Sequence, residues 1–122
     1  STYSVRVLCC GDRNWTNTDV ILDTLLQYVH IPNMVIIHGG ARGADFLAGE
    51  VAKELGFKVE VYPADWKKYP RAAGPIRNVQ MLAAKPDHVI AFHNSIGTSK
   101  GTGHMIRITK AADVSYEVKT CL

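Results

Sequence analysis

Short apolar runs of strand length alternate with helical periodicity along the whole chain, and this alternation limits the fold more than any other feature. We expect strands over residues 5–10, 34–38, 57–62, 88–92 and 115–119. Apolar residues at helical spacing predict helices over 19–29, 44–55, 75–85 and 104–112, the first ending near His30. Strands that alternate with helices and are nearly continuous in apolar character indicate a parallel sheet covered on both faces. We therefore predict an α/β fold, a Rossmann-like three-layer sandwich with a mainly parallel five-stranded sheet.

Length and composition are those of one globular domain. The 122 residues correspond to one ordinary domain, residues 1–122, with 47% hydrophobic and 20% charged residues. The apolar runs are far shorter than the roughly 20 residues needed to cross a bilayer, and the first residues lack the plan of a signal peptide. Three cysteines, Cys9, Cys10 and Cys121, form neither a disulfide framework nor a CxxC site. We expect a cytoplasmic protein with reduced thiols.

The charge is uneven along the chain. Residues 1–61 hold five Lys and Arg against seven Asp and Glu, whereas residues 62–122 hold nine against four. The net charge of +3 is too small to predict avid nucleic-acid binding. The local excess of cations suits a pocket for a small anion.

The most informative motif lies between the second predicted strand and the helix after it. It contains Gly39, Gly40, Arg42, Gly43 and Asp45. Glycines allow the backbone to approach a ligand closely, and free amides in the first turn of a helix attract phosphate or carboxylate. The motif matches neither the GxGxxG fingerprint nor the P-loop, so nicotinamide and ordinary ATPase chemistry are not supported. The alternative is a tight turn that needs small residues for packing.

A second group of candidates follows the first predicted strand. After Gly11, Arg13 could pair with a phosphate, or it could form an internal salt bridge to Asp45 or Asp65. Trp15 could stack on a base, or it could fill the core. This segment follows the carboxyl end of a strand, as the glycine motif does.

Two later segments complete the candidate set. Residues 63–74 show no periodicity and read as a long functional loop, in which Asp65 and Trp66 precede Lys67 and Lys68, two lysines that we expect to be solvated. Arg77 and Asn78 would lie in the first turn of the next helix, with side chains able to reach a ribose or a phosphate. Gly101 and Thr102 belong to a Gly/Ser/Thr loop that is a second candidate phosphate cradle. The histidines show no metal-binding spacing, and we expect neither a metal nor a cofactor.

Together these motifs resemble the YspA/cpYpsA-related branch of the SLOG (Smf/DprA and LOG) superfamily, found in bacteria and phages. The resemblance rests on residues 11–15 (GDRNW), 39–45 (GGARGAD), 64–66 (ADW), 73–78 (AGPIRN) and 101–102 (GT), which occur in the family's order. It implies a Rossmann-like fold whose glycine loops bind a nucleotide or an ADP-ribose-like ligand, as a sensor or a sequestering protein. It also suggests a homodimer, located in the bacterial cytoplasm or, for a phage protein, in that of the host.

The resemblance leaves catalysis open. LOG-type phosphoribohydrolases use an arginine and a glutamate, and Arg77 looks like the counterpart of that arginine. No carboxylate follows Gly101 and Thr102 as the glutamate does in LOG, so hydrolysis would need another acid, Asp12, Asp45 or Asp65. The other alternative is a module that binds single-stranded nucleic acid, like the DprA relatives. This alternative is supported only by the basic residues of the loop 63–74 and by the two tryptophans, Trp15 and Trp66.

Overall fold

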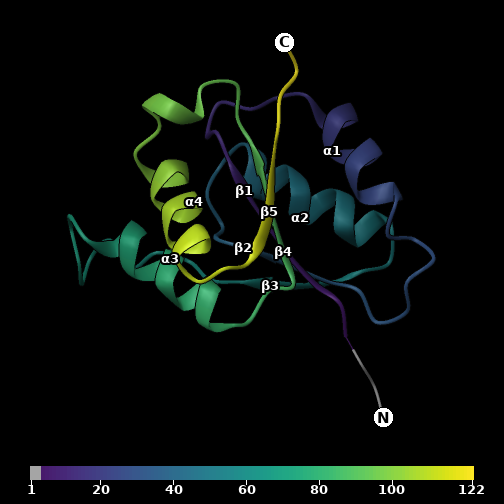
Figure 1. Cartoon of the computed structure of the whole chain (residues 1–122), viewed down its shortest axis with the longest axis horizontal. Coiled ribbons are helices and arrows are strands. Elements are labelled where there is room, and N and C mark those ends of the chain that lie inside the picture. Colours follow the sequence, from purple (N-terminus) through teal and green to yellow (C-terminus); the bar gives the residue numbers. More distant parts are fainter. Residues whose placement is uncertain (1–3) are drawn as a thin grey trace.

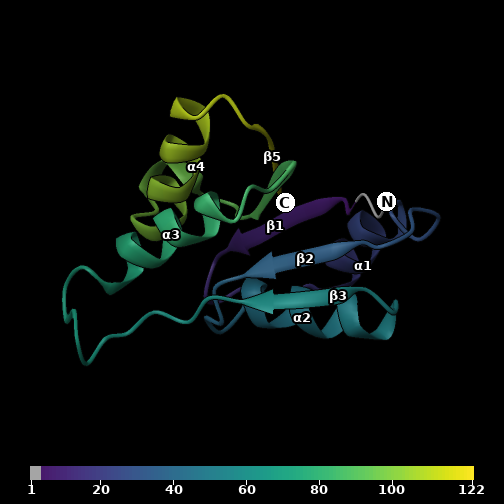
Figure 2. The same cartoon turned by 90° about the horizontal axis from the view of Figure 1, so that it is seen from below.

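A computed structural model describes residues 4–122 and shows one sheet between two pairs of helices (Figures 1 and 2). The strands are β1 (Arg6–Gly11), β2 (Val35–His38), β3 (Lys58–Val61), β4 (His88–Phe92) and β5 (Ser115–Lys119). The helices are α1 (Thr18–Leu26), α2 (Ala44–Glu54), α3 (Ala73–Ala83) and α4 (Gly101–Ala111), with a short 3-10 helix η1 (Ile96–Thr98) before α4. Figure 2 shows α3 and α4 on one side of the sheet and α1 and α2 on the other.

The strand order is β3-β2-β1-β4-β5, and every neighbouring pair is parallel. The chain builds one half of the sheet outward from β1 and then returns to add β4 on the other side of β1. The order of connection therefore reverses between β1 and β4, which is where open α/β sheets form their ligand crevice. The predicted fold class is confirmed.

Each face of the sheet has its own apolar core because side chains alternate along a strand. On β1, Val7 and Cys9 pack with the core that includes α1 and α2. Leu8 and Cys10 point to the opposite face, where they pack with Met81 of α3 and with residues of α4. The central strands are buried on both faces, which explains why their sequences read as continuous apolar runs.

Several predicted boundaries were wrong at helix ends. α1 ends at Leu26 rather than near His30, because the chain tightens into turns in which the amide of Tyr28 donates to the carbonyl of Leu25. α3 begins at Ala73, so Pro75 lies inside the first turn, where its missing N–H is harmless. α4 begins at Gly101, so Gly101 and Thr102 belong to a helix rather than to the preceding loop. Across residues 4–122, no helix combines the length and apolar character needed to span a membrane.

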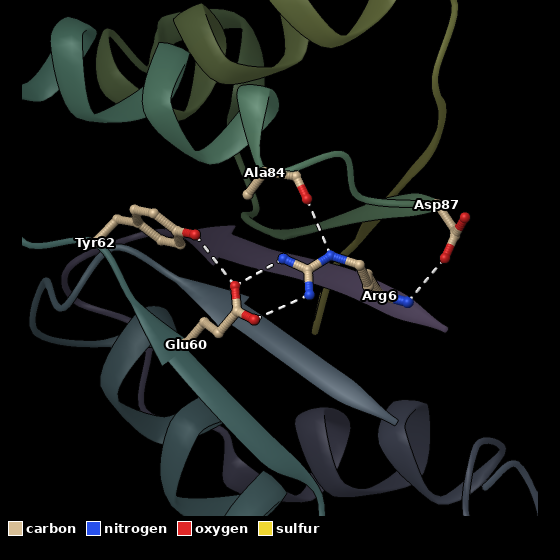
Figure 3. Close-up of polar contacts among 5 residues, drawn as sticks. All are labelled: Arg6, Glu60, Tyr62, Ala84 and Asp87. Atoms are coloured by element: carbon tan, nitrogen blue, oxygen red, sulfur yellow. Dashed lines mark hydrogen bonds and ion pairs between the residues drawn. The ribbon is translucent and has the colours of Figure 1, made fainter. Parts of the chain in front are cut away.

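Arg6 joins three elements through its backbone and side chain (Figure 3). Its guanidinium donates to both carboxylate oxygens of Glu60 on β3, at 2.9 and 2.7 Å, and its Nε donates to the carbonyl of Ala84 at the end of α3, at 3.0 Å. The Tyr62 hydroxyl also donates to Glu60 at 3.1 Å, and the Arg6 amide donates to Asp87 at 2.8 Å. This group fastens the end of α3 to the sheet, and so helps to place the start of α3 at the opposite edge.

We predict that Glu60→Gln destabilises the protein by about 1 kcal/mol at pH 7, the upper range for a partly exposed ion pair. The hydrogen bond from Arg6 lowers the pKa of Glu60 below 4.5, so the stabilisation is present above pH 4.5 and is lost as the pH falls through the lowered value. Urea unfolding of both proteins between pH 7 and pH 3 measures the difference.

Glu50→Gln is the matched control, because Glu50 forms an exposed pair with Lys53 at 3.4 Å on a single helix. We expect it to change the free energy of unfolding by less than about 0.5 kcal/mol. A loss for Glu60→Gln that stays constant down to pH 3 would contradict the role given to its charge.

Candidate functional site

Two adjoining cavities open at the carboxyl edge of the sheet, beside the point where the strand order reverses. Their volumes are about 330 and 620 Å³. Figure 2 shows the strands ending on this side and the segment between β3 and α3 extending beyond it. Five residues from separate segments line both cavities: Arg13, Ala41, Arg42, Trp66 and Arg77.

A buried carboxylate organises the turn between β2 and α2. Asp45 is only 4% exposed and accepts a hydrogen bond from the amide of Gly39 at 2.8 Å. The Arg77 guanidinium in turn donates to the carbonyl of Gly39 at 2.5 Å. A Cβ at position 39 would collide with that guanidinium, so glycine allows Arg77 to lie directly against the turn. Asp45 and Arg77 therefore hold the same peptide segment from α2 and from α3.

Burial raises the pKa of Asp45 from 3.8 to about 6. Hydrogen bonds from the amides of Gly39 and Ala41 and the charges of Arg77 and Arg13 oppose this shift without cancelling it. Burial also lowers the pKa of Arg77, and the charge of Asp45 acts in the opposite direction. The two groups thus stabilise one another's charged forms inside a poorly solvated site.

The glycine turn has fewer free amides than the sequence suggested. The amide of Gly40 donates to Nδ1 of His38 at 3.0 Å, and those of Gly39 and Ala41 are used by Asp45. A buried carboxylate must be surrounded by donors, and here the turn supplies them. Within residues 4–122, the structure records no hydrogen bond for the amides of Arg42 and Gly43.

The turn after β1 packs closely against the start of α2. The amide of Ala44 donates to the carbonyl of Asp12 at 3.0 Å. Gly43 has a φ of 78°, and a Cβ there would collide with the backbone of Asp12 and Arg13. A glycine is therefore required at position 43 for packing. For this residue, the alternative of a tight turn that needs small residues is the one that the structure supports.

Cationic side chains dominate the larger cavity. Its lining includes five cations, Arg13, Arg42, Arg71, Arg77 and Lys100, and two carboxylates, Asp12 and Asp45. Arg13 is exposed, with its guanidinium carbon 6.0 Å from the ring centre of Trp66. Arg42 is also exposed and donates to Asn14 at 3.2 Å. In the described part of the chain neither arginine forms a salt bridge.

Most predicted site residues come together around these cavities. Gly39 and Gly40 line the smaller one, and the larger one includes Gly11, Asp45, Asn78, Gly101 and Thr102. The amide of Thr102 already donates to Ser99 Oγ at 3.1 Å, so the second cradle is also partly used internally.

Three predicted residues line neither cavity. Trp15 is 5% exposed and packs in the core, with its ring centre 5.8 Å from that of Phe92. Gly43 packs against the turn after β1, as described above. Asp65 accepts from the Lys68 amide at 3.1 Å and stabilises a turn. Of the two roles open for Trp15, filling the core is the one that the structure supports.

Other residues line the larger cavity although the sequence gave no clear reason to select them. They include Asn14, Arg71, His93, Ser99 and His104. Arg71 lies in the predicted functional loop 63–74, and Asn14 lies in the GDRNW segment, residues 11–15. The sequence therefore pointed to these two segments, although not to these two side chains. His104 could not be found in this way, because its place depends on α4 starting three residues earlier than predicted.

Comparison with known proteins identifies the family of this Rossmann-like chain. Residues 5–69, more than half of it, match the model of the YspA, cpYpsA-related SLOG family (YAcAr). The Gene 61 protein of Mycobacterium phage D29 is 37% identical over 116 residues, which cover 89% of this chain and 91% of the phage protein. The chain belongs to the YspA, cpYpsA-related SLOG family, as its motifs predicted.

The fold also resembles that of a solved protein, DNA processing protein A (DprA) from Streptococcus pneumoniae. The TM-score is 0.71 and the sequence identity 16%, and the match covers 93% of this chain and 50% of the DprA chain. This chain therefore spans half of the DprA protein, and the likeness concerns the fold alone.

We predict that Asp45 makes the protein less stable as the pH rises from about 4 to 6. The folded protein retains a proton on Asp45 that the unfolded chain, with a pKa near 3.8, has already released. A shift to about 6 corresponds to roughly 3 kcal/mol. Urea unfolding at each pH should show this loss in the wild type relative to Asp45→Asn, which has no charge to bury.

Carbon-13 NMR of the Asp45 carboxyl group gives the pKa directly and should show a midpoint near 6. Glu60 and Glu117 have lowered pKa values and act in the opposite direction in both proteins, so the comparison between variants cancels them. Stability curves that run parallel from pH 4 to pH 7 would rule out the burial cost assigned to Asp45.

Proposed function

We propose that this protein binds a nucleotide-derived ligand that carries phosphate groups, with ADP-ribose as the representative, in the cavities at the carboxyl edge of the sheet. The observation that carries this proposal is the common lining of both cavities, which places Arg13, Arg42 and Arg77 around an exposed Trp66. Guanidinium groups suit the bidentate recognition of phosphate, and an indole ring offers a face on which a base can stack.

The three arginines would contribute in different ways. Arg77 is fixed, because its Nη1 donates to Gly39 and its Nε donates to Asn78 at 3.2 Å. Its Nη2 has no recorded partner within residues 4–122 and is free for a ligand oxygen. Arg13 and Arg42 are exposed and would close around the phosphates from the turns after β1 and β2. The positive charge thus comes mainly from side chains, since many turn amides are already used.

Trp66 lies on the irregular segment between β3 and α3 and is 46% exposed. Its ring is the large aromatic surface that reaches both cavities. A base stacked there would lie beside Arg13, whose guanidinium already rests over the indole. This arrangement favours a ligand that combines an aromatic base with phosphate over a simple inorganic anion.

Binding is favoured over hydrolysis by the state of the carboxylates. Asp45, the acid that hydrolysis would need beside Arg77, is held by the amides of Gly39 and Ala41. Asp65 lies outside both cavities, and Asp12 lines the larger one but already accepts from the amide of Asn14 at 2.8 Å. Release of free base from a nucleoside monophosphate, lost in Asp45→Asn, would instead favour a phosphoribohydrolase.

Titration calorimetry with ADP-ribose, ADP and AMP tests the proposal. We expect Arg13→Ala and Arg42→Ala each to weaken ADP-ribose binding roughly 10- to 100-fold, the range for a lost hydrogen-bonded charge. Lys58→Ala is the control, because Lys58 is an exposed cation on β3 and lines neither cavity. It removes the same charge and should change the affinity little.

Equal losses in Arg42→Ala and Lys58→Ala would show that net charge alone attracts the ligand, and would contradict a site at the cavities. Failure of the wild type to bind any of the three nucleotides would end the proposal for this ligand class.

A second candidate, single-stranded nucleic acid, is favoured by one observation. Residues 63–72 expose Trp66 and Tyr69 together with Lys67 and Lys68, an arrangement of aromatic and basic groups that suits an unpaired strand. Lys67 and Lys68 line neither cavity, so the double variant Lys67→Ala, Lys68→Ala separates the two candidates. Fluorescence anisotropy with an oligothymidylate should detect a loss in this variant and a strong salt dependence if the strand binds there.

A further inference from the structure

A hydrogen-bonded chain runs from Arg77 through Asn78 to His104. The Oδ1 atom of Asn78 lies 3.2 Å from Nε of Arg77. Its Nδ2 lies 3.2 Å from the carbonyl oxygen of Gly101 and 3.1 Å from Nδ1 of His104. Asn78 is 5% exposed, so these contacts are made inside the protein.

The chemistry of these groups determines the direction of every bond. A guanidinium can only donate, so the Asn78 atom facing Arg77 must be its oxygen. The amide nitrogen then faces the other way with two hydrogens, and the carbonyl of Gly101 accepts one of them. The second hydrogen points to Nδ1 of His104, which must therefore be the unprotonated nitrogen of the ring. In a neutral imidazole the proton is then on Nε2.

We infer that Asn78 holds His104 as the neutral Nε2–H tautomer, and that this N–H is a donor for a hydrogen-bond acceptor of the ligand in the larger cavity. The ligand part of this inference rests on the proposed function. His104 lines that cavity, and within residues 4–122 the structure records no partner for its Nε2. His104 is thereby a specificity-determining residue that no motif in the sequence marked.

The surroundings keep the ring neutral. Burial, and then the charge of Arg107 on the same helix, lower the pKa of His104 below 6.5. On α3, the Asn78 amide group faces Nδ1, and Arg77 lies behind it. Protonation would place an N–H of the imidazolium against the N–H of Asn78, which costs the hydrogen bond between them. At pH 7 the cavity therefore meets a fixed donor at this position.

A fixed neutral donor selects for a particular ligand chemistry. It pairs with a carbonyl, hydroxyl or phosphate oxygen, or with an unprotonated ring nitrogen, and it rejects an amino group at the same place. A mismatch would leave two donors facing each other in a partly buried site. The position thus recognises an acceptor, in addition to the charge recognition by the arginines.

The tautomer is tested in the ligand-free protein by long-range proton–nitrogen NMR at pH 8, which distinguishes Nδ1–H from Nε2–H. We expect the Nε2–H pattern for His104 in the wild type. Asn78→Asp keeps an acceptor for Arg77 but places a carboxylate against Nδ1. In this variant His104 should change to Nδ1–H, and its pKa should rise above that of the wild type.

His38 is the internal control, because its Nδ1 accepts from the amide of Gly40 at 3.0 Å and its tautomer should be the same in both proteins. An Nδ1–H pattern for His104 in the wild type, or an unchanged His104 pattern in Asn78→Asp, would overturn the assignment.

The ligand part is tested by calorimetry with ADP-ribose. His104→Leu removes the donor and should weaken binding roughly 3- to 10-fold, the effect of one neutral hydrogen bond. His104→Gln retains an N–H donor and should recover part of the loss, whereas equal affinities of all three proteins would refute the contact. If the wild type binds no nucleotide, the proposed function and the ligand contact fail together, and the spectra alone decide the tautomer.

Discussion

The burial of the Asp45 carboxylate, in the first turn of α2 beside the end of β2, is the constraint on which the rest of the site depends. Asp45 has lost most of its water, so the chain must surround it with donors, and the amides of Gly39 and Ala41 serve this purpose. Arg77 adds its charge and also holds the carbonyl of Gly39. The turn between β2 and α2 is thus folded around the Asp45 carboxylate. The Arg77 guanidinium contacts this turn from α3, on the other face of the sheet.

This arrangement changes the reading of the glycine motif. A turn with free amides would be a phosphate cradle, but this turn uses much of its donor capacity to stabilise Asp45. Under the proposed function, the affinity for an anion would come mainly from Arg13, Arg42 and the free nitrogen of Arg77. The glycine motif thus contributes to the architecture of the site and not only to a surface for a ligand.

The fold could be predicted because its signals are local and repeated. Short segments of strand length located all five strands, most of them apolar runs next to glycine or proline, and their alternation with helices indicated a parallel sheet. The site could be predicted only in outline. Parallel strands bring their carboxyl ends to one edge, which explains why Gly39 and Arg77 meet, but sequence cannot say which amides are already bonded. Trp15 and Asp65 stood among the candidate ligand contacts, with the core left open for Trp15, because a core position and a turn cap look the same in sequence as an exposed site. His104 was missed because a one-turn difference at a helix start decides which side chains face inward.

The close packing of the turn after β1 against α2 links two groups that are far apart in sequence. The bond from the Ala44 amide to the Asp12 carbonyl, and the bare backbone at Gly43, join the segment that carries Arg13 to the one that carries Arg42. The two guanidinium groups therefore sit on a shared rigid support, whereas Trp66 extends from an irregular strand-to-helix connection. Under the proposed function, this shared support would limit the spacing of the two guanidinium groups, and with it the spacing of the negative groups that one small molecule can present to both.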